Sequence, residues 1–377
     1  MVHLVTLGWI TASILGALHL VGPMALRTPM PVRRVDYVVF VLFVAGLSGL
    51  VMHFWIEEYS GVAFAGLMAA AAGAQVGMKV VKGLRDAPVS LGVRAHFLLA
   101  FVNLMLAGGV GILLGANKLF PFLPGYVLAN VAAHAHLAIV GWAAMMVFAA
   151  GYRLLPMLLP AAMPPAIGVW TSAVLTEVAT LGLAVSLALQ STWVRVFAVL
   201  AIGGGGAFLG SVAWMRLHPR PPAKGLRRPD LGVVQVGLAL AYLATSCALG
   251  LVLAFSETSA WTLRLAPLYG VCLLVGFLAQ MVVGVARRLM PLLAWFGAFA
   301  ARDLVTPPPA SPHDYPSRRL EAATLALWTA GVPLLATGFY LERPPVLQSG
   351  GLTLLAAVLC GASSHVAVWR AAWSTKW

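Results

Sequence analysis

The sequence predicts an all-α integral membrane protein with about eleven transmembrane helices. Of its 377 residues, 61% are hydrophobic and only 9% are charged, whereas a soluble domain carries about 25% charged residues. Apolar stretches long enough to cross a bilayer as helices, about 20 residues each, recur from one end of the chain to the other. They are too long for barrel strands, and backbone groups in lipid must be bonded internally, so helices are expected. The lipid bilayer is therefore the predicted environment.

The apolar segments follow one another with short connections. The first has no basic residues before its apolar part and no small-residue cleavage site after it, which predicts a mature helix and not a signal peptide. The one long connection, residues 299–319, is rich in proline and is predicted to be a mobile cytoplasmic connector. The expected spans are 4–26, 37–56, 62–81, 93–114, 126–155, 166–189, 194–217, 231–255, 263–289, 320–341 and 346–371.

The net charge of +13 does not require a nucleic-acid partner. Basic residues form short clusters between apolar segments, as after the first segment (Arg27, Arg33 and Arg34), and the positive-inside rule accounts for this placement. The clusters follow the first, third, seventh and ninth segments. We therefore expect a multi-pass protein of a bacterial-type inner membrane with its N-terminus outside and its C-terminus inside.

An internal repeat is the most informative feature of the sequence. His3-Leu4, Gly8-Trp9 and Pro23-Met24 recur 133 residues later as His136-Leu137, Gly141-Trp142 and Pro156-Met157. A third copy, from Gly276 to Pro291, follows the second at an offset of 135 residues. We expect a single transmembrane domain over residues 1–377, with repeats at about 1–125, 126–262 and 263–377 that form three pseudo-symmetric arcs.

Histidines within the predicted helices are the candidate functional residues, because metal-capable side chains are costly in lipid. His134 and His136 are two positions apart, about 200° around a helix, so they should serve two different centres. His3, the repeat mate of His136, is expected to form a bis-imidazole pair with it for a low-spin haem b. His134, with His53 nearby, is expected to hold a second haem or a copper ion. The alternative roles are helix packing for His134 and His136, a headgroup position for His3 and an aromatic-belt position for His53.

The segment His134-Ala-His136-Leu-Ala-Ile-Val-Gly141-Trp142, which ends in Tyr152-Arg-Leu-Leu-Pro156, resembles a known motif. It is similar to the HxH helix of the haem–copper oxidase subunit I superfamily, especially the cbb-type oxidases. It also resembles the HAH motif of NnrS-type haem- and copper-containing membrane proteins. The oxidase resemblance implies that the first histidine binds a high-spin haem and the second a low-spin haem, in a fold of three helical arcs.

The sequence also departs from the oxidase pattern. No His-His pair for the family's copper site occurs, eleven segments replace twelve, and the motif lies in the second repeat and not in the third. The resemblance therefore implies one or two haems b, with copper as a further candidate but without a complete copper site.

These features lead to one expected function and two alternatives. The expected function is haem binding, in respiratory electron transfer or in oxygen or nitric oxide chemistry. The protein could be an oxidoreductase in either case. Cytochrome c, quinol or other respiratory subunits would be the partners. The alternatives are a transporter of a metal ion or small solute and a cofactor-free anchor subunit of a respiratory complex.

Overall fold

The computed structural model describes residues 2–221, 229–299 and 311–374. Within these ranges the regular structure is helical, apart from one isolated bridge between Ala161 and Pro219. Eleven of the helical spans are long and apolar enough to cross a membrane, which confirms the predicted class of fold. The proline-rich connector predicted at 299–319 lies partly outside the described residues, because 300–310 are not among them.

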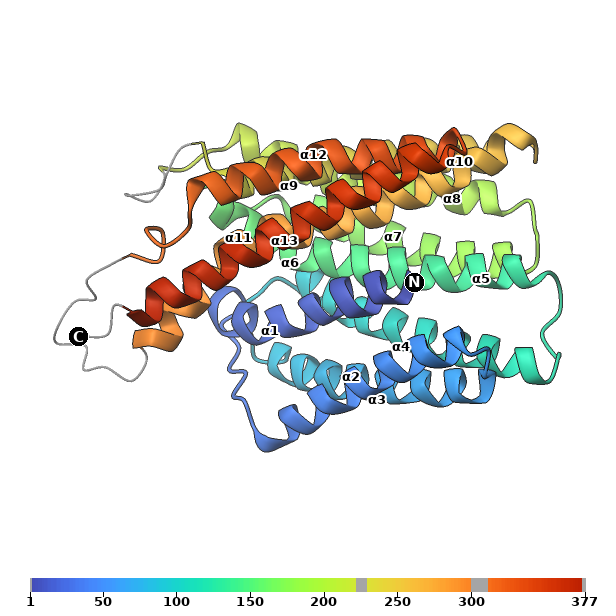
Figure 1. The fold of residues 1–377 in the computed structure, drawn as a ribbon, viewed down its shortest axis with the longest axis horizontal. Helices are drawn as coiled ribbons and strands as arrows, with labels where there is room; N and C mark the ends of the chain where they lie inside the picture. The colour runs from blue at the N-terminus through green and yellow to red at the C-terminus, as the bar shows by residue number, and fades with distance from the viewer. Residues whose placement is uncertain (1, 222–228, 300–310, 375–377) are drawn as a thin grey trace. The chain divides into compact units, whose positions relative to one another are not determined.

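The chain divides into two compact units, residues 1–220 and 221–377. The first unit holds seven candidate spans. Short loops connect each span to the next (Figure 1). Its elements are η1 (Leu4–Thr11), α1 (Ala12–Ala25), α2 (Arg34–Trp55), α3 (Tyr59–Leu84), α4 (Leu91–Leu119), α5 (Val127–His136), η2 (Leu137–Ala144), α6 (Met145–Leu158), α7 (Ala166–Ala188) and α8 (Val194–Leu217).

The second unit holds four candidate spans. The division falls one helix before the expected start of the third repeat, because the helix from Leu231 to Phe255 belongs to the second unit. Its elements are α9 (Leu231–Phe255), α10 (Ala260–Val271), η3 (Cys272–Ala279), α11 (Gln280–Phe299), α12 (Arg318–Tyr340) and α13 (Pro344–Ser374).

Three of the spans contain a π-helical stretch at equivalent positions. The stretches η1, η2 and η3 are eight residues each and begin at Leu4, Leu137 and Cys272, so they are separated by 133 and 135 residues. These are the offsets of the sequence repeat. Each stretch continues into an α-helix with an interior proline, at Pro23, Pro156 and Pro291. The repeat thus coincides with a backbone feature that is rare and frequently found at functional sites.

The residue before each π-helical stretch is also equivalent in the three copies. It is His3 before η1, His136 before η2 and Val271 before η3. Two of the three copies therefore place an imidazole at the entrance to the widened part of the helix, and the third places an aliphatic side chain there.

Close contacts between neighbouring helices explain why the sequence is rich in glycine. A Cβ at Gly46 of α2 would lie 2.7 Å from the backbone nitrogen of Ala69 in α3. One at Gly204 of α8 would lie 2.8 Å from the nitrogen of Thr176 in α7. Small residues permit such approach of helix backbones in lipid, where the attraction between helices comes from packing.

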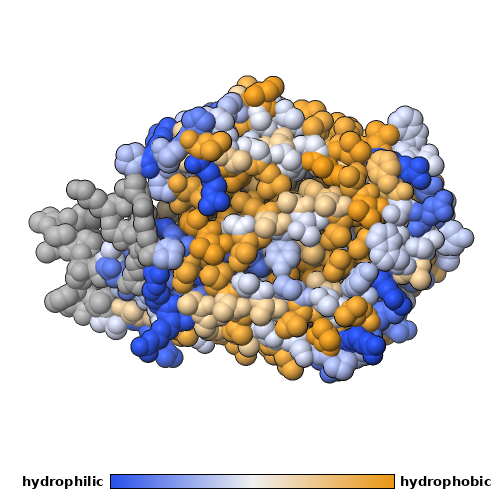
Figure 2. Space-filling model, turned by 90° about the horizontal axis from the view of Figure 1, so that it is seen from above, coloured by the Kyte–Doolittle hydropathy of each residue, from blue (hydrophilic) through white to orange (hydrophobic). Residues whose placement is uncertain are grey.

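The exposed side chains of the helices are mainly hydrophobic (Figure 2). Large apolar residues such as Phe40, Phe64, Leu128 and Leu352 are more than half exposed. A water-soluble protein would bury many of these side chains, whereas lipid tails solvate them. The surface therefore supports a bilayer environment for both units.

Candidate functional site

The helix that carries both candidate histidines changes its winding immediately after them. His134 and His136 lie in the last turn of α5, and η2 begins at the next residue, Leu137. Both side chains are half-buried. The two rings are two positions apart at the end of an α-helical turn, so they point to opposite sides of the helix.

His134 is held by the neighbouring helix α4. Its Nδ1 lies 3.0 Å from the carbonyl oxygen of Ala107. A carbonyl oxygen only accepts hydrogen bonds, so Nδ1 carries the proton and Nε2 keeps its lone pair. One turn further along α4, Gly111 leaves room for the ring, because a Cβ there would lie 3.0 Å from Cε1 of His134. The ring is therefore oriented in the tautomer that binds a metal through Nε2.

His136 has a similar hydrogen bond, but within its own helix. Its Nδ1 lies 2.8 Å from the carbonyl oxygen of Ala132, four residues earlier. The same reasoning assigns the proton to Nδ1 and the lone pair to Nε2. Each histidine of the motif thus has the outer hydrogen bond that metal-binding imidazoles almost always have.

His3 lies beside His134. The two ring centroids are 6.4 Å apart, with an angle of 42° between the ring planes. His3 also stacks on Phe54 of α2, at 5.4 Å and 14°. The repeat predicted a pairing of His3 with His136, and the structure places His3 beside His134, the other histidine of the motif.

A buried hydrogen bond joins η1 to the motif helix and so contributes to the position of His3. The indole Nε1 of Trp142 donates to Oγ1 of Thr11 over 3.0 Å, and both residues are at most 3% exposed. Thr11 ends the same π-helical stretch that His3 precedes. Trp142 belonged to the predicted motif, but its partner was not evident from the sequence, since it depends on how η1 and η2 pack.

His53 has an acidic partner and not an imidazole one. Its Nδ1 lies 3.1 Å from Oε2 of Glu58, just beyond the end of α2. Glu58 also caps α3, because it accepts a hydrogen bond from the backbone nitrogen of Gly61 over 2.7 Å. The sequence predicted His53 near His134 as a ligand of the second centre. In the structure the His53 ring lies beside the Glu58 carboxylate at the connection between α2 and α3.

Buried polar residues elsewhere in the first unit bond across helices. His96 is fully buried, with Nδ1 at 2.8 Å from the carbonyl oxygen of Gly92 and Nε2 at 3.2 Å from Oγ of Ser172. Asn103 of α4 donates to Glu177 of α7 over 2.6 Å. Both nitrogens of His96 are therefore engaged, which leaves it no lone pair for a ligand.

The described residues contain no group of three or more His, Cys, Asp or Glu side chains placed to hold a metal ion. A bare copper or zinc ion takes three or four ligands from the protein, so the His3–His134 pair alone does not form such a site. Two imidazoles bound to opposite sides of one metal through bonds of about 2 Å have ring centres roughly 6 Å apart. The observed 6.4 Å matches this spacing. The pair therefore fits a group that brings its own remaining ligands, as haem does with its four pyrrole nitrogens.

Gly111, Ala107 and Phe54 were not among the predicted site residues. Gly111 and Ala107 are four residues apart on one side of α4, and such a small-xxx-small pair signals close approach of another helix. The sequence therefore indicated contact on this side of α4, but it did not show that the contacting group is an imidazole. No protein-family model matches the sequence, and no curated protein is significantly similar to it.

Proposed function

We propose that the protein is a haem-binding integral membrane protein similar in plan to haem–copper oxidase subunit I. It would act in respiratory electron transfer or in oxygen or nitric oxide chemistry, in a bacterial-type inner membrane with the N-terminus outside. The observation that carries the proposal is the His3–His134 pair, with ring centroids 6.4 Å apart, next to a His134 whose Nδ1 is bonded to Ala107. Haem bound there would supply one-electron redox chemistry.

The residues of the chain have distinct roles in this proposal. His134 and His3 would hold one haem between them, and Ala107 orients the His134 ring through its carbonyl oxygen. This assigns the low-spin haem to His134, whereas the oxidase resemblance implies His136. This revises the pairing of His3 with His136 that the repeat suggested. His136, on the opposite side of the helix, is the candidate ligand of a second haem with one open axial position, where a diatomic gas could bind. Cytochrome c or a quinol is the proposed electron donor.

The visible spectrum of the purified protein tests the proposal. Protein from haem-replete cells is expected to show the Soret and α bands of haem b, and His134→Ala and His3→Ala are each expected to lose the low-spin spectrum. His218→Ala is the matched control, since His218 is an exposed histidine that stacks on Trp214 at the end of α8.

The other outcomes separate the competing functions. If His136→Ala removes the low-spin spectrum and His134→Ala leaves it intact, His3 pairs with His136 as the repeat suggested. A colourless protein with a stoichiometric metal ion would indicate a metal transporter. A colourless protein without metal would indicate an anchor subunit, and either colourless result would contradict haem binding.

A further inference from the structure

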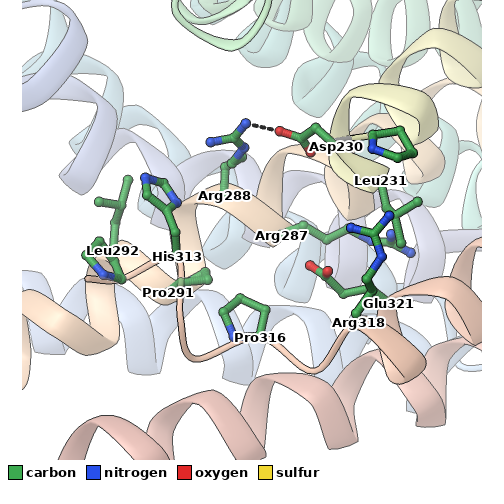
Figure 3. Close-up of a pocket in the computed structure, with 12 residues that line it drawn as sticks. Asp230, Leu231, Arg287, Arg288, Pro291, Leu292, His313, Pro316, Arg318 and Glu321 are labelled. Carbon is green, nitrogen blue, oxygen red and sulfur yellow. Dashed lines mark hydrogen bonds and ion pairs between the residues drawn. The ribbon is translucent and has the colours of Figure 1, made fainter. Parts of the chain in front are cut away.

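A pocket in the second unit (Figure 3) contains a buried arginine whose terminal nitrogens have no hydrogen-bond partner within the part of the chain that the structure describes. The pocket is formed by the start of α9, the middle of α11, the segment before α12 and the first turn of α12. It has a volume of about 50 Å³, several times the space that one water requires. Its lining residues are Pro229, Asp230, Leu231, Arg287, Arg288, Pro291, Leu292, Pro312, His313, Pro316, Arg318 and Glu321.

Arg287 is the residue that distinguishes this pocket from an ordinary surface hollow. It is only 7% exposed, and neither Nη1 nor Nη2 has a hydrogen-bond partner among the described residues. Glu321, which also lines the pocket, interacts with Arg287 electrostatically but accepts no hydrogen bond from either terminal nitrogen. A buried guanidinium whose N–H groups are not hydrogen-bonded is costly. An anion in the pocket would remove this cost by accepting both terminal N–H groups.

The neighbouring Arg288 does not share this property. It forms an ion pair with Asp230 (Figure 3). Asp230 also caps α9, accepting hydrogen bonds from the backbone nitrogens of Gly232 (2.9 Å) and Val233 (3.2 Å). The carboxylate of Asp230 is therefore engaged by Arg288 and by the start of α9, and it accepts no hydrogen bond from the terminal nitrogens of Arg287.

The charges around the pocket favour an anion. Three arginines and two carboxylates line it, so the lining has a net positive charge with His313 neutral. The helix α12 also begins at the pocket, and a helix N-terminus attracts anions through its unbonded N–H groups. Ser317, the N-cap residue of α12, makes no side-chain capping bond. The Ser317 side chain therefore does not accept a hydrogen bond from the first N–H groups of α12, and an anion in the pocket could accept one.

We propose that this pocket binds a phosphate group, with Arg287 as the residue that holds it. The planar guanidinium offers two parallel N–H donors that match two phosphate oxygens. The phosphate could belong to a phospholipid headgroup at the membrane surface or to a soluble phosphate compound. The pocket lies entirely within the second unit, so this proposal is independent of haem binding.

Ligand-dependent thermal unfolding of the full-length protein in non-ionic detergent tests the proposal. The probes are inorganic phosphate, compared with chloride at equal ionic strength, and phosphatidylglycerol, compared with phosphatidylcholine in mixed micelles. Arg287→Gln is the test variant. Arg319→Gln is the matched control, because Arg319 is exposed at the start of the same α12 and does not line the pocket. At least one probe is expected to raise the Tm of the wild type and of Arg319→Gln. The apparent affinity of Arg287→Gln for that probe is expected to be about ten-fold weaker than that of the wild type.

Each result supports or overturns the proposal. Stabilisation by inorganic phosphate alone indicates a soluble ligand, and stabilisation by phosphatidylglycerol alone indicates a lipid headgroup. If Arg287→Gln gives no folded protein, Arg287→Lys takes its place, since it keeps the charge but loses the two-pronged geometry. The proposal is overturned if neither probe stabilises the wild type, or if the Arg287 and Arg319 variants respond alike.

Discussion

At the scale of the residue, the central feature is an imidazole whose direction is fixed from outside its own helix. The carbonyl oxygen of Ala107 receives the Nδ1 proton of His134, and Gly111 supplies the space in which the ring lies. His136, by contrast, is held by Ala132 of its own helix. The direction of the His134 ring therefore depends on the contact between α4 and α5.

This difference makes Gly111 a sensitive position. Gly111→Val is expected to push the His134 ring from its place, because even a Cβ would lie 3.0 Å from Cε1, and to lower the haem-to-protein ratio several-fold. Gly109→Val is the matched control, since no atom lies within 4 Å of a Cβ at Gly109 on the same helix. The ratio is measured by the pyridine haemochrome assay on purified protein. Equal haem contents in the two variants would show that Gly111 does not position a haem ligand.

The sequence selects the candidate histidines but does not specify which residues they contact. His3, His134 and His136 were selected because ionisable groups are rare in lipid and because two of them occupy repeat-equivalent positions. The contact of His3 with His134 and that of His53 with Glu58 depend on how neighbouring helices are rotated about their axes. A single sequence does not specify that rotation, so the residue pairs could only be obtained from the structure.

At the scale of the element, hairpins of adjacent helices are joined by backbone-to-backbone contacts at glycine. The α12–α13 hairpin is the clearest case. A Cβ at Gly338 would lie 2.6 Å from the backbone nitrogen of Leu347, and one at Gly350 would overlap the backbone of Leu335. Backbone atoms cannot rotate away as the end of a side chain can. A larger residue must therefore separate the two helices.

Gly350→Val is accordingly expected to destabilise the protein by about 3 kcal/mol or more, the upper part of the range for overpacking. Gly351→Val, one position along α13, is expected to have little effect because nothing lies within 4 Å of a Cβ there. The two variants are heated in detergent, and the fraction of each protein that remains monodisperse is measured at each temperature. The midpoints of the two curves are then compared. A Gly350 variant as stable as the Gly351 variant would contradict the close packing of α12 and α13.

At the scale of the whole molecule, the number of membrane spans was predictable because it depends on composition and length alone. All eleven expected segments coincide with helical spans. The ends were less predictable. The ninth span begins at Ala260 and extends to Phe299, beyond the expected 263–289, because the helix continues through Pro291 into a further apolar stretch. The division of the chain at residue 220 was not predicted. It depends on tertiary packing and not on the repeat pattern.

The proposed orientation of the chain in the membrane rests on the placement of its basic residues and is testable with cysteine labelling. In intact cells, a membrane-impermeant maleimide is expected to label Thr192→Cys, in the exposed connection between α7 and α8, and not Ser90→Cys, in the exposed connection between α3 and α4. Permeabilised cells should label both. The native cysteines Cys247, Cys272 and Cys360 are half-buried or buried, so the wild type serves as the background. The reverse pattern in intact cells would invert the proposed topology.

The π-helical stretches have a consequence for how such a molecule could change over evolutionary time. An α-helix that gains or loses one residue turns everything beyond the change by about 100°, and a π-helical turn is in effect an α-helical turn with one residue inserted. Loss of one residue within η2 would let the helix close into regular α-helix while swinging His134 and His136 to new directions. Insertions and deletions within η1 and η2, without any exchange of side chains, would therefore be enough to change which imidazole contacts which neighbour.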